Sequence, residues 1–157
     1  MKRFFLLLIM CFVLVSLTGF DSNNTTLKIT DAEVTLIKVE RVLRYDFKIK
    51  NLGKNTVGGN EDYPGHHPLS LNMAVRPNPS LADCMEMETI QNTKYKKMVN
   101  RGSGGTGYIT PGEEGQFHLE YQIKKDTNLE AAKQKALDGT LIIMDGVKVI
   151  AEIPLNK

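Results

Sequence analysis

The middle of the sequence holds six side chains that could bind a soft metal ion: His66, His67, Met73, Cys84, Met85 and Met87. Imidazole, thiolate and thioether groups are ligands that copper and zinc take in proteins, and Cu(I) favours sulfur. Adjacent residues of an extended chain point to opposite sides, however, so one ion rarely reaches both histidines. We keep His66, His67, Met85 and Met87 as candidate copper or zinc ligands, beside the simpler interpretation of a solvated histidine pair.

The methionines also have a purely structural interpretation. Met85 and Met87 would share one face of a short extended segment, and Met73 lies in an alternating apolar run. Both patterns are typical of side chains that pack in a hydrophobic core. We therefore expect no resident cofactor, with copper or zinc as the alternative.

Three glycines, Gly102, Gly104 and Gly107, have the G-x-G-x-x-G spacing of a dinucleotide-binding loop. That motif needs a helix that begins at the glycines, because the N-terminal amides of the helix bind the pyrophosphate. Here Pro111 follows four residues later, and an alternating strand pattern comes next. We predict a flexible loop over residues 102–107 instead of a nucleotide site.

Signatures of catalysis are missing from the sequence, which contains no G-x-S-x-G, H-E-x-x-H or P-loop motif. Cys84 with His66 or His67 is a conceivable nucleophile and base, but no local signature surrounds them. Cys84 is also the only cysteine after residue 19, so no internal disulfide is expected and a buried, inert thiol is favoured. We expect no enzymatic activity.

The first 19 residues have the three parts of a secretory signal peptide. Lys2 and Arg3 precede an apolar run of 14 residues, 4–17, which is followed by small and polar residues. Spanning a bilayer takes about 20 apolar residues. Cys11 lies inside the run, where lipidation is not expected. We predict a signal peptide over residues 1–19, a polar tether over 20–26 and one domain over 27–157, with an uncleaved anchor as the alternative because no clear small-x-small cleavage pair is present.

Charge excludes one class of partner. Removal of residues 1–19 would take away two basic residues and no acidic one, which leaves 18 of each sign. Nucleic-acid binding requires a surplus or stripe of Lys and Arg, so we exclude it. Lys94, Lys96 and Lys97 form a small basic cluster that we expect to be a solvated face. Membrane contact is expected only through an uncleaved N-terminal segment.

Alternation of apolar and polar residues predicts strands along most of the domain. The clearest runs cover residues 45–50 and 117–124, each with one apolar and one polar face. A strand over residues 26–40 is predicted to break near Asp31. Further strands are expected in 69–75, 84–89 and 95–99.

One helix and one hairpin complete the predicted elements. The helix covers residues 128–138, with Thr127 as N-cap, Glu130 completing a capping box and Gly139 as the left-handed end. Asp145-Gly146 between apolar strands predicts a C-terminal hairpin with a two-residue turn. Seven to nine short strands with frequent turns predict a mainly β domain, a single antiparallel β-sandwich.

Three segments carry a resemblance to a known kind of domain: YDFKIKNLG at residues 45–53, ITPGE at 109–113 and FHLEYQI at 117–123. They resemble the immunoglobulin-like sandwich of exported bacterial proteins and, more loosely, the intracellular proteinase-inhibitor family of bacilli. In such domains a strand ends in Asn-x-Gly, and a later Pro-Gly turn precedes an amphipathic strand. The resemblance implies an immunoglobulin-like fold over residues 27–153 and transfers no functional residue.

Together these observations predict an exported bacterial protein, secreted or held at the cell surface, that binds a protein or a cell-wall component without catalysis. We expect binding through the loops at one end of the sandwich, over residues 58–68 and 100–107, because loops carried by a rigid scaffold commonly bind. Extracytoplasmic copper or zinc binding is the first alternative. Inhibition of an extracellular protease is the second.

Overall fold

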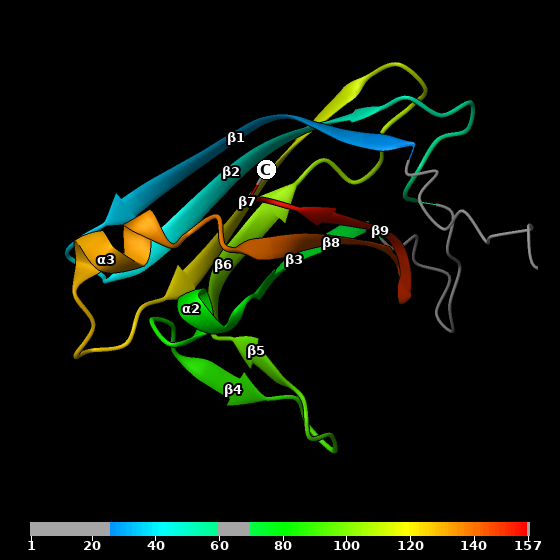
Figure 1. The fold of residues 1–157 in the computed structure, drawn as a ribbon. Helices are drawn as coiled ribbons and strands as arrows, with labels where there is room; N and C mark the ends of the chain where they lie inside the picture. The colour runs from blue at the N-terminus through cyan, green and yellow to red at the C-terminus, as the bar shows by residue number, and fades with distance from the viewer. Residues whose placement is uncertain (1–25, 60–69, 157) are drawn as a thin grey trace, which may run out of the picture.

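The computed structural model describes residues 26–59 and 70–156. Over these residues the chain forms nine strands and two short helices (Figure 1). Every pair of neighbouring strands is antiparallel, so the mainly β, antiparallel fold class predicted from the alternation is confirmed. In this described part of the chain, no helix has the length and apolar character needed to cross a membrane.

The larger sheet has four strands in the order β1-β2-β7-β6. They are β1 (Leu27–Ile37), β2 (Val42–Asn51), β7 (Glu114–Gln122) and β6 (Asn100–Gly105). The predicted break in the first strand is present as an irregularity in the pairing of β1 with β2, where the register shifts between Ile29 and Asp31. Such a bulge bends a strand without ending it, which is why one strand continues through the break.

The second sheet has three strands in the order β3-β8-β9. They are β3 (Leu71–Pro77), β8 (Gly139–Asp145) and β9 (Lys148–Pro154). The predicted C-terminal hairpin with its two-residue turn is confirmed, but Asp145 pairs with Lys148, so the turn residues are Gly146 and Val147. Gly146 has a φ of 60°, which glycine adopts without steric cost.

A separate two-stranded unit pairs β4 (Met87–Thr89) with β5 (Lys96–Met98). The short helix α2 (Pro79–Ala82) precedes it and was not predicted. Pro79 lies in the first turn of this helix. The fixed φ of proline suits that position, and its missing N–H has no intrahelical partner there in any case.

Most of the glycine-rich segment belongs to strand β6, so the prediction of a flexible loop over residues 102–107 is wrong for residues 102–105. Gly104 lies opposite His118 and Gly105 opposite Phe117 in the pairing of β6 with β7. A Cβ atom at Gly105 would come within 2.3 Å of Phe117 Cδ1, and one at Gly104 within 2.7 Å of His118 Cε1. The two rings occupy the space of the missing side chains, so these glycines allow close packing instead of flexibility.

Helix α3 (Leu129–Gln134) is shorter than predicted and has a different cap. The N-cap is Asn128, whose side chain accepts a hydrogen bond from the backbone N–H of Ala131 at 3.0 Å. Thr127 is therefore not the cap. Gly139 also does not end the helix in a left-handed conformation, because it already belongs to β8.

Arg41, in the turn between β1 and β2, explains where this helix begins. Its Nη2 donates hydrogen bonds to the backbone carbonyls of Lys124 and Thr127, at 2.5 and 2.6 Å. Arg41 itself has a φ of 55°, in the left-handed region. The contact fixes the end of the β7–α3 connection at Thr127, which leaves Asn128 to cap the helix.

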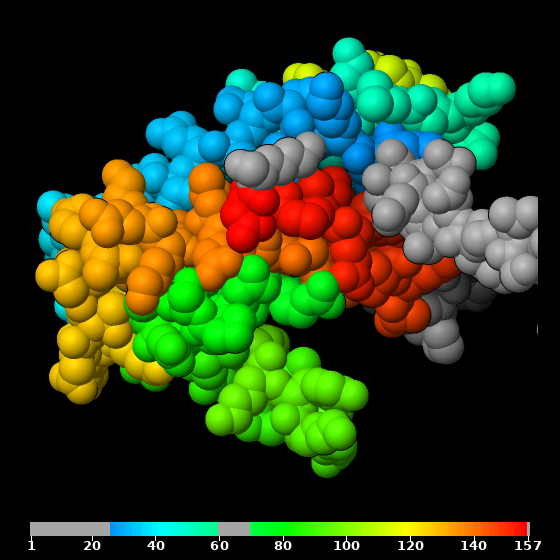
Figure 2. All heavy atoms as spheres, viewed as in Figure 1, coloured from blue at the N-terminus to red at the C-terminus, as the bar shows by residue number. Residues whose placement is uncertain are grey.

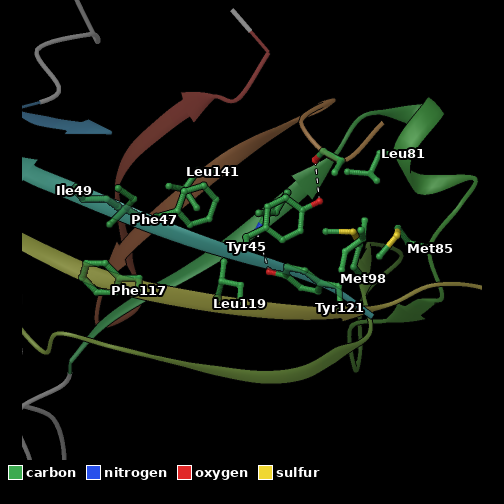
Figure 3. Close-up of a cluster of buried hydrophobic side chains, with 14 of the residues drawn as sticks. Tyr45, Phe47, Ile49, Leu81, Met85, Met98, Phe117, Leu119, Tyr121 and Leu141 are labelled. Atoms are coloured by element: carbon green, nitrogen blue, oxygen red, sulfur yellow. Dashed lines mark hydrogen bonds between the residues drawn. The ribbon is translucent and has the colours of Figure 1, made fainter. Parts of the chain in front are cut away.

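Buried side chains of both larger sheets belong to one hydrophobic cluster (Figure 3). The Tyr45 ring stacks on Phe47 and meets Tyr121 edge-on, with ring centroids 5.9 and 6.0 Å apart. The Tyr45 hydroxyl donates to the carbonyl of Ala136 at 2.8 Å, and the Tyr121 hydroxyl accepts from the N–H of Val75 at 2.9 Å. The second bond joins β7 of the larger sheet to β3 of the smaller one.

Candidate functional site

The structure places half of the predicted metal ligands. His66 and His67 lie outside the described residues. Met85 is fully buried in the core (Figure 3). Met87 is partly buried and pairs with Met98 across β4 and β5. Over residues 26–59 and 70–156, no three His, Cys, Asp or Glu side chains lie together in a way that could hold a metal ion. Both methionines contact the hydrophobic core.

Cys84 is a free thiol buried at the end of α2. Its Sγ lies 3.5 Å from the carbonyl oxygen of Ser80, as a weak donor. A cysteine in this environment packs as a small apolar residue. The expectation of a buried thiol at this position is confirmed.

The outer face of the larger sheet carries a compact set of charges. Arg44 donates to Asp46 through Nε and Nη2, at 2.9 and 2.8 Å, and to Glu120 through Nη1 at 3.1 Å. The hydrogen bond to Arg44 lowers the pKa of Asp46 below its ordinary value, and the electrostatic interaction with His118, which lies opposite Asp46 on β7, also lowers it. The same bond with Asp46 raises the pKa of Arg44.

Arg44, Asp46 and His118 line a shallow groove of about 410 Å³ that crosses β1, β2 and β7. The groove also contains Lys48, which pairs with Asp31 at 3.2 Å. Arg44, Asp46 and Lys48 are more than one-third exposed and each has an opposite charge beside it. Exposed pairs of this kind contribute little energy, so we interpret this face as a solvated surface.

A more promising binding surface is formed by residues 87–98, which we call the arm. The arm contains β4, β5 and the turn between them, and it projects from the body of the molecule (Figures 1 and 2). Its base is anchored because Met98 is buried and Met87 packs against the same core. The arm is therefore a firmly held projection and not a loose loop.

At the tip, the arm presents an apolar pair to solvent. The N–H of Ile90 donates to the carbonyl of Tyr95 at 2.9 Å, so these residues lie opposite each other. They are three pairs beyond Met87 and Met98, and successive pairs alternate between the two faces of a hairpin. Since the methionines face the core, Ile90 and Tyr95 face away from it, and their exposed fractions are 40% and 64%.

A hydrogen-bonded turn holds this pair in position. The backbone N–H and the Oγ1 of Thr93 both donate to the Ile90 carbonyl, at 3.0 and 2.9 Å. The N–H of Tyr95 donates to Thr93 Oγ1 at 3.2 Å. Asn92 has a φ of 61°, which Asn tolerates better than most residues. The tip is thus ordered before any partner arrives.

The arm is also cationic. Lys94, Lys96 and Lys97 are exposed, and the only acidic residue of the arm, Glu88, pairs with Lys97 at 3.2 Å. Lys94 Nζ lies 5.8 Å from the centroid of the Tyr95 ring, within the range of a cation–π contact. The arm therefore combines an exposed apolar pair with two lysines, Lys94 and Lys96, that form no ion pair with any acidic residue in the described part of the chain.

The loops predicted to bind are brought together only in part. Val57 bridges to Ile109, and the N–H of Leu71 donates to the carbonyl of Gly107, so residues 57–59 and 107–109 lie at the same end. Residues 60–68 are outside the described part of the chain, and 100–105 form a strand. The arm is not predicted from the sequence as a binding surface, because Lys94, Lys96 and Lys97 are interpreted there as a solvated face. The polar turn Gln-Asn-Thr between Ile90 and Lys94-Tyr95 was the available signal.

Fold and arm together define an antiparallel, mainly β protein with one projecting hairpin. Comparisons of the chain with protein-family models, with curated proteins and with solved structures found nothing that matches. The geometry of the described residues is therefore the basis for a proposed function.

Proposed function

We propose that this chain is an exported, non-enzymatic binding module built on an immunoglobulin-like β-sandwich. In constant-type immunoglobulin domains, strands A, B, E and D form one sheet and strands C, F and G the other. The order β1-β2-β7-β6 corresponds to A-B-E-D, and β3-β8-β9 corresponds to C-F-G. This correspondence supports the sandwich and makes the arm an insertion between strands C and D.

One observation carries the binding role, namely the solvent-facing pair of Ile90 and Tyr95 on the hydrogen-bonded tip of the arm. Two apolar side chains held in water add little to the stability of the domain, whereas a partner that covers them gains their burial. An ordered aromatic anchor also loses little entropy on binding. The partner is a component of the cell envelope, which is a surface protein, a wall polymer or the membrane surface, and the arm takes the place of the end loops as its main contact.

The N-terminal sequence supports location outside the cytoplasm. Residues 1–19 have the basic, apolar and small-residue parts of a signal peptide. A chain that follows this route is secreted or stays at the cell surface. The arm would then face extracytoplasmic partners.

The test is co-sedimentation of the purified exported protein with isolated envelopes of a bacterial host. Replacing both tip residues, Ile90→Ser with Tyr95→Ser, is expected to weaken binding by on the order of tenfold, because anchor residues carry most of a binding energy. The matched control is Val39→Ser, in the β1–β2 turn, where the valine is 97% exposed. Equal binding of all three proteins, or no binding by any, would contradict the proposal.

A second candidate function, inhibition of an extracellular protease, is favoured by the same ordered and convex tip. A preorganised loop can occupy the cleft of an enzyme at little entropic cost. Purified protein is expected to slow at least one enzyme in a panel of bacterial serine proteases, and the Tyr95→Ser change should abolish that effect. Unchanged activity across the panel would dismiss this candidate.

A further inference from the structure

We infer that the arm docks on a bilayer surface that contains anionic phospholipids, an inference that rests on the proposed binding role of the arm. The sequence alone suggested membrane contact only through residues 1–19. The arm provides a second route, which uses the folded domain itself. Three properties support the inference: the exposed apolar pair at the tip, the shape of the tip, and the positive charge of the arm.

The apolar pair has the composition of an interfacial anchor. Tyrosine places its ring in an apolar layer while its hydroxyl stays hydrated, and it is enriched at membrane–water interfaces. Ile90 lies opposite Tyr95, so both side chains leave the same face of the tip. Lys94, next to Tyr95, can extend its charged end to the headgroups while its methylene stem lies along the apolar layer.

The shape of the tip favours a lipid surface over a protein surface. A stable protein interface buries about 800 Å² on each partner. The tip is a narrow projection, as Figure 2 shows, and its exposed apolar contact consists of Ile90 and Tyr95. A bilayer surface deforms around such a projection, whereas a rigid protein would need a matching cavity.

Charge orients the molecule toward an anionic surface. Residues 20–157 contain 18 basic and 18 acidic residues, and the arm has three lysines against one glutamate. The arm therefore has an excess of two positive charges, and the remainder of these residues has an equal negative excess. Such an asymmetry turns the arm toward a negative surface and keeps the rest of the domain away from it.

The first experiment uses the absence of tryptophan from the chain. A Tyr95→Trp protein carries a single tryptophan, at the tip, and a Tyr108→Trp protein carries one at Tyr108, which is 58% exposed and lies outside the arm. Vesicles of equal parts phosphatidylcholine and phosphatidylglycerol are expected to shift the emission of the Tyr95→Trp protein to shorter wavelength. The Tyr108→Trp protein should show no shift. Absence of a shift for Tyr95→Trp, or an equal shift for both proteins, would overturn the inference.

The second experiment measures the contribution of the lysines. A lysine near an anionic surface contributes a factor of about five to partitioning, so Lys94→Gln with Lys96→Gln should weaken vesicle binding on the order of twentyfold. The matched control is Lys133→Gln with Lys135→Gln, at the exposed surface of α3 and its C-cap. An equal loss in both double variants would show that only total charge matters and would overturn docking through the arm.

The two proposals can fail separately. Arm-dependent binding to envelopes without binding to phosphatidylglycerol vesicles would overturn the lipid inference and leave the binding module, with an acidic protein or wall polymer as its partner. If the changes in the arm leave binding to both envelopes and vesicles unaltered, both proposals are wrong. Arm-dependent binding in both assays, reduced by added salt as screening requires, would support both.

Discussion

Tyr45 and Tyr121 bring two hydroxyl groups into the hydrophobic core. Each hydroxyl is hydrogen-bonded to the backbone of a distant segment, one to the carbonyl of Ala136 and the other to the N–H of Val75. A buried polar group without a partner would cost about 1 to 3 kcal/mol. Each of these bonds therefore both satisfies its own partners and links parts of the fold that are far apart in sequence.

Replacement of Tyr45 by phenylalanine tests the first of these bonds. We expect Tyr45→Phe to lower the free energy of unfolding by about 1 to 2 kcal/mol, because the Ala136 carbonyl loses its donor while the ring packing stays. Urea unfolding followed by circular dichroism measures the change. Tyr95→Phe, which alters an exposed ring, is the control and should have no effect. Equal stability of the Tyr45→Phe protein and the native protein would show that this bond contributes nothing.

Alkaline pH should destabilise the domain through the same two residues. Burial raises the pKa of both Tyr45 and Tyr121 above the ordinary value, since their ionised forms are disfavoured in the core. The folded state then binds these protons more tightly than the unfolded state. The stabilisation is complete below about pH 10, the unfolded pKa of tyrosine, and declines as the pH rises above it. Unfolding by urea at a series of pH values from about 8 to 11 measures this.

A Tyr45→Phe and Tyr121→Phe double variant provides the control for that pH series. Removing the two buried phenols should flatten the decline in stability above about pH 10. An equally steep decline in the double variant would assign the effect to other groups.

The metal hypothesis can be tested without disturbing the core. Met85 is fully buried, and replacing it by alanine would cost about 2 to 5 kcal/mol through the cavity it leaves. Lost metal affinity in such a variant could therefore reflect unfolding. If the protein binds copper or zinc through the predicted ligands, His66→Ala with His67→Ala and the partly buried Met87→Ala should each weaken binding in calorimetric titration. Unchanged affinity in these variants would contradict the hypothesis.

Among the elements, strand β6 shows that a glycine-rich sequence can be a structural requirement. The rings of His118 and Phe117 on β7 occupy the positions where β6 would carry side chains at Gly104 and Gly105. The strand remains paired because its neighbour provides the packing that glycine lacks. Sheet packing thus accounts for Gly104 of the G-x-G-x-x-G pattern and for the neighbouring Gly105.

A methyl group at Gly105 tests this interpretation. It would lie 2.3 Å from Phe117 Cδ1 and 2.8 Å from the backbone oxygen of Gln116, so one of them must move. We expect Gly105→Ala to reduce the free energy of unfolding by about 1 to 3 kcal/mol, as overpacking does. The matched control is Gly107→Ala, where the nearest atom would be Ser70 Oγ at 3.6 Å. Thermal unfolding of both variants measures the difference, and equal melting temperatures would contradict the packing argument.

At the scale of the whole molecule, stability is expected to be unevenly distributed. Strands β2 and β7 lie in the interior of the larger sheet and β8 in the middle of the smaller one, whereas the arm is a two-stranded unit attached at its base. Backbone amides in central, buried strands open only with global unfolding, and those of projecting hairpins open locally. The hydrogen bonds of the arm are therefore expected to open more often than those of the core strands, without unfolding of the core, although the tip is ordered in the folded state.

Hydrogen exchange measured by mass spectrometry checks this distribution. Peptides from β2, β7 and β8 should exchange most slowly, and the peptide covering residues 88–97 should exchange much faster. Vesicles that contain phosphatidylglycerol should slow exchange in the arm peptide alone. Uniformly slow exchange in the free protein would contradict local opening of the arm.

The sequence by itself determined the strands with one buried face, because burial on one face leaves a period of two in the order of residues. Alternation in residues 45–50 and 117–124 therefore predicted buried faces correctly, and Asp145-Gly146 predicted the final hairpin. The mainly β class follows from such local patterns. The irregularity near Asp31 was also visible as an interruption of the alternation.

Tertiary structure decided what depends on residues that are distant in sequence. Gly105 is required because of Phe117, and Asn128 caps α3 because Arg41 fixes Thr127 in the preceding turn. Contacts between distant residues also decide which face of the arm is exposed. Ile90 and Tyr95 face solvent only because Met98, on the opposite face of the hairpin, is buried in a core built from both sheets. Such contacts join segments far apart in the chain, so no local pattern of residues contains them.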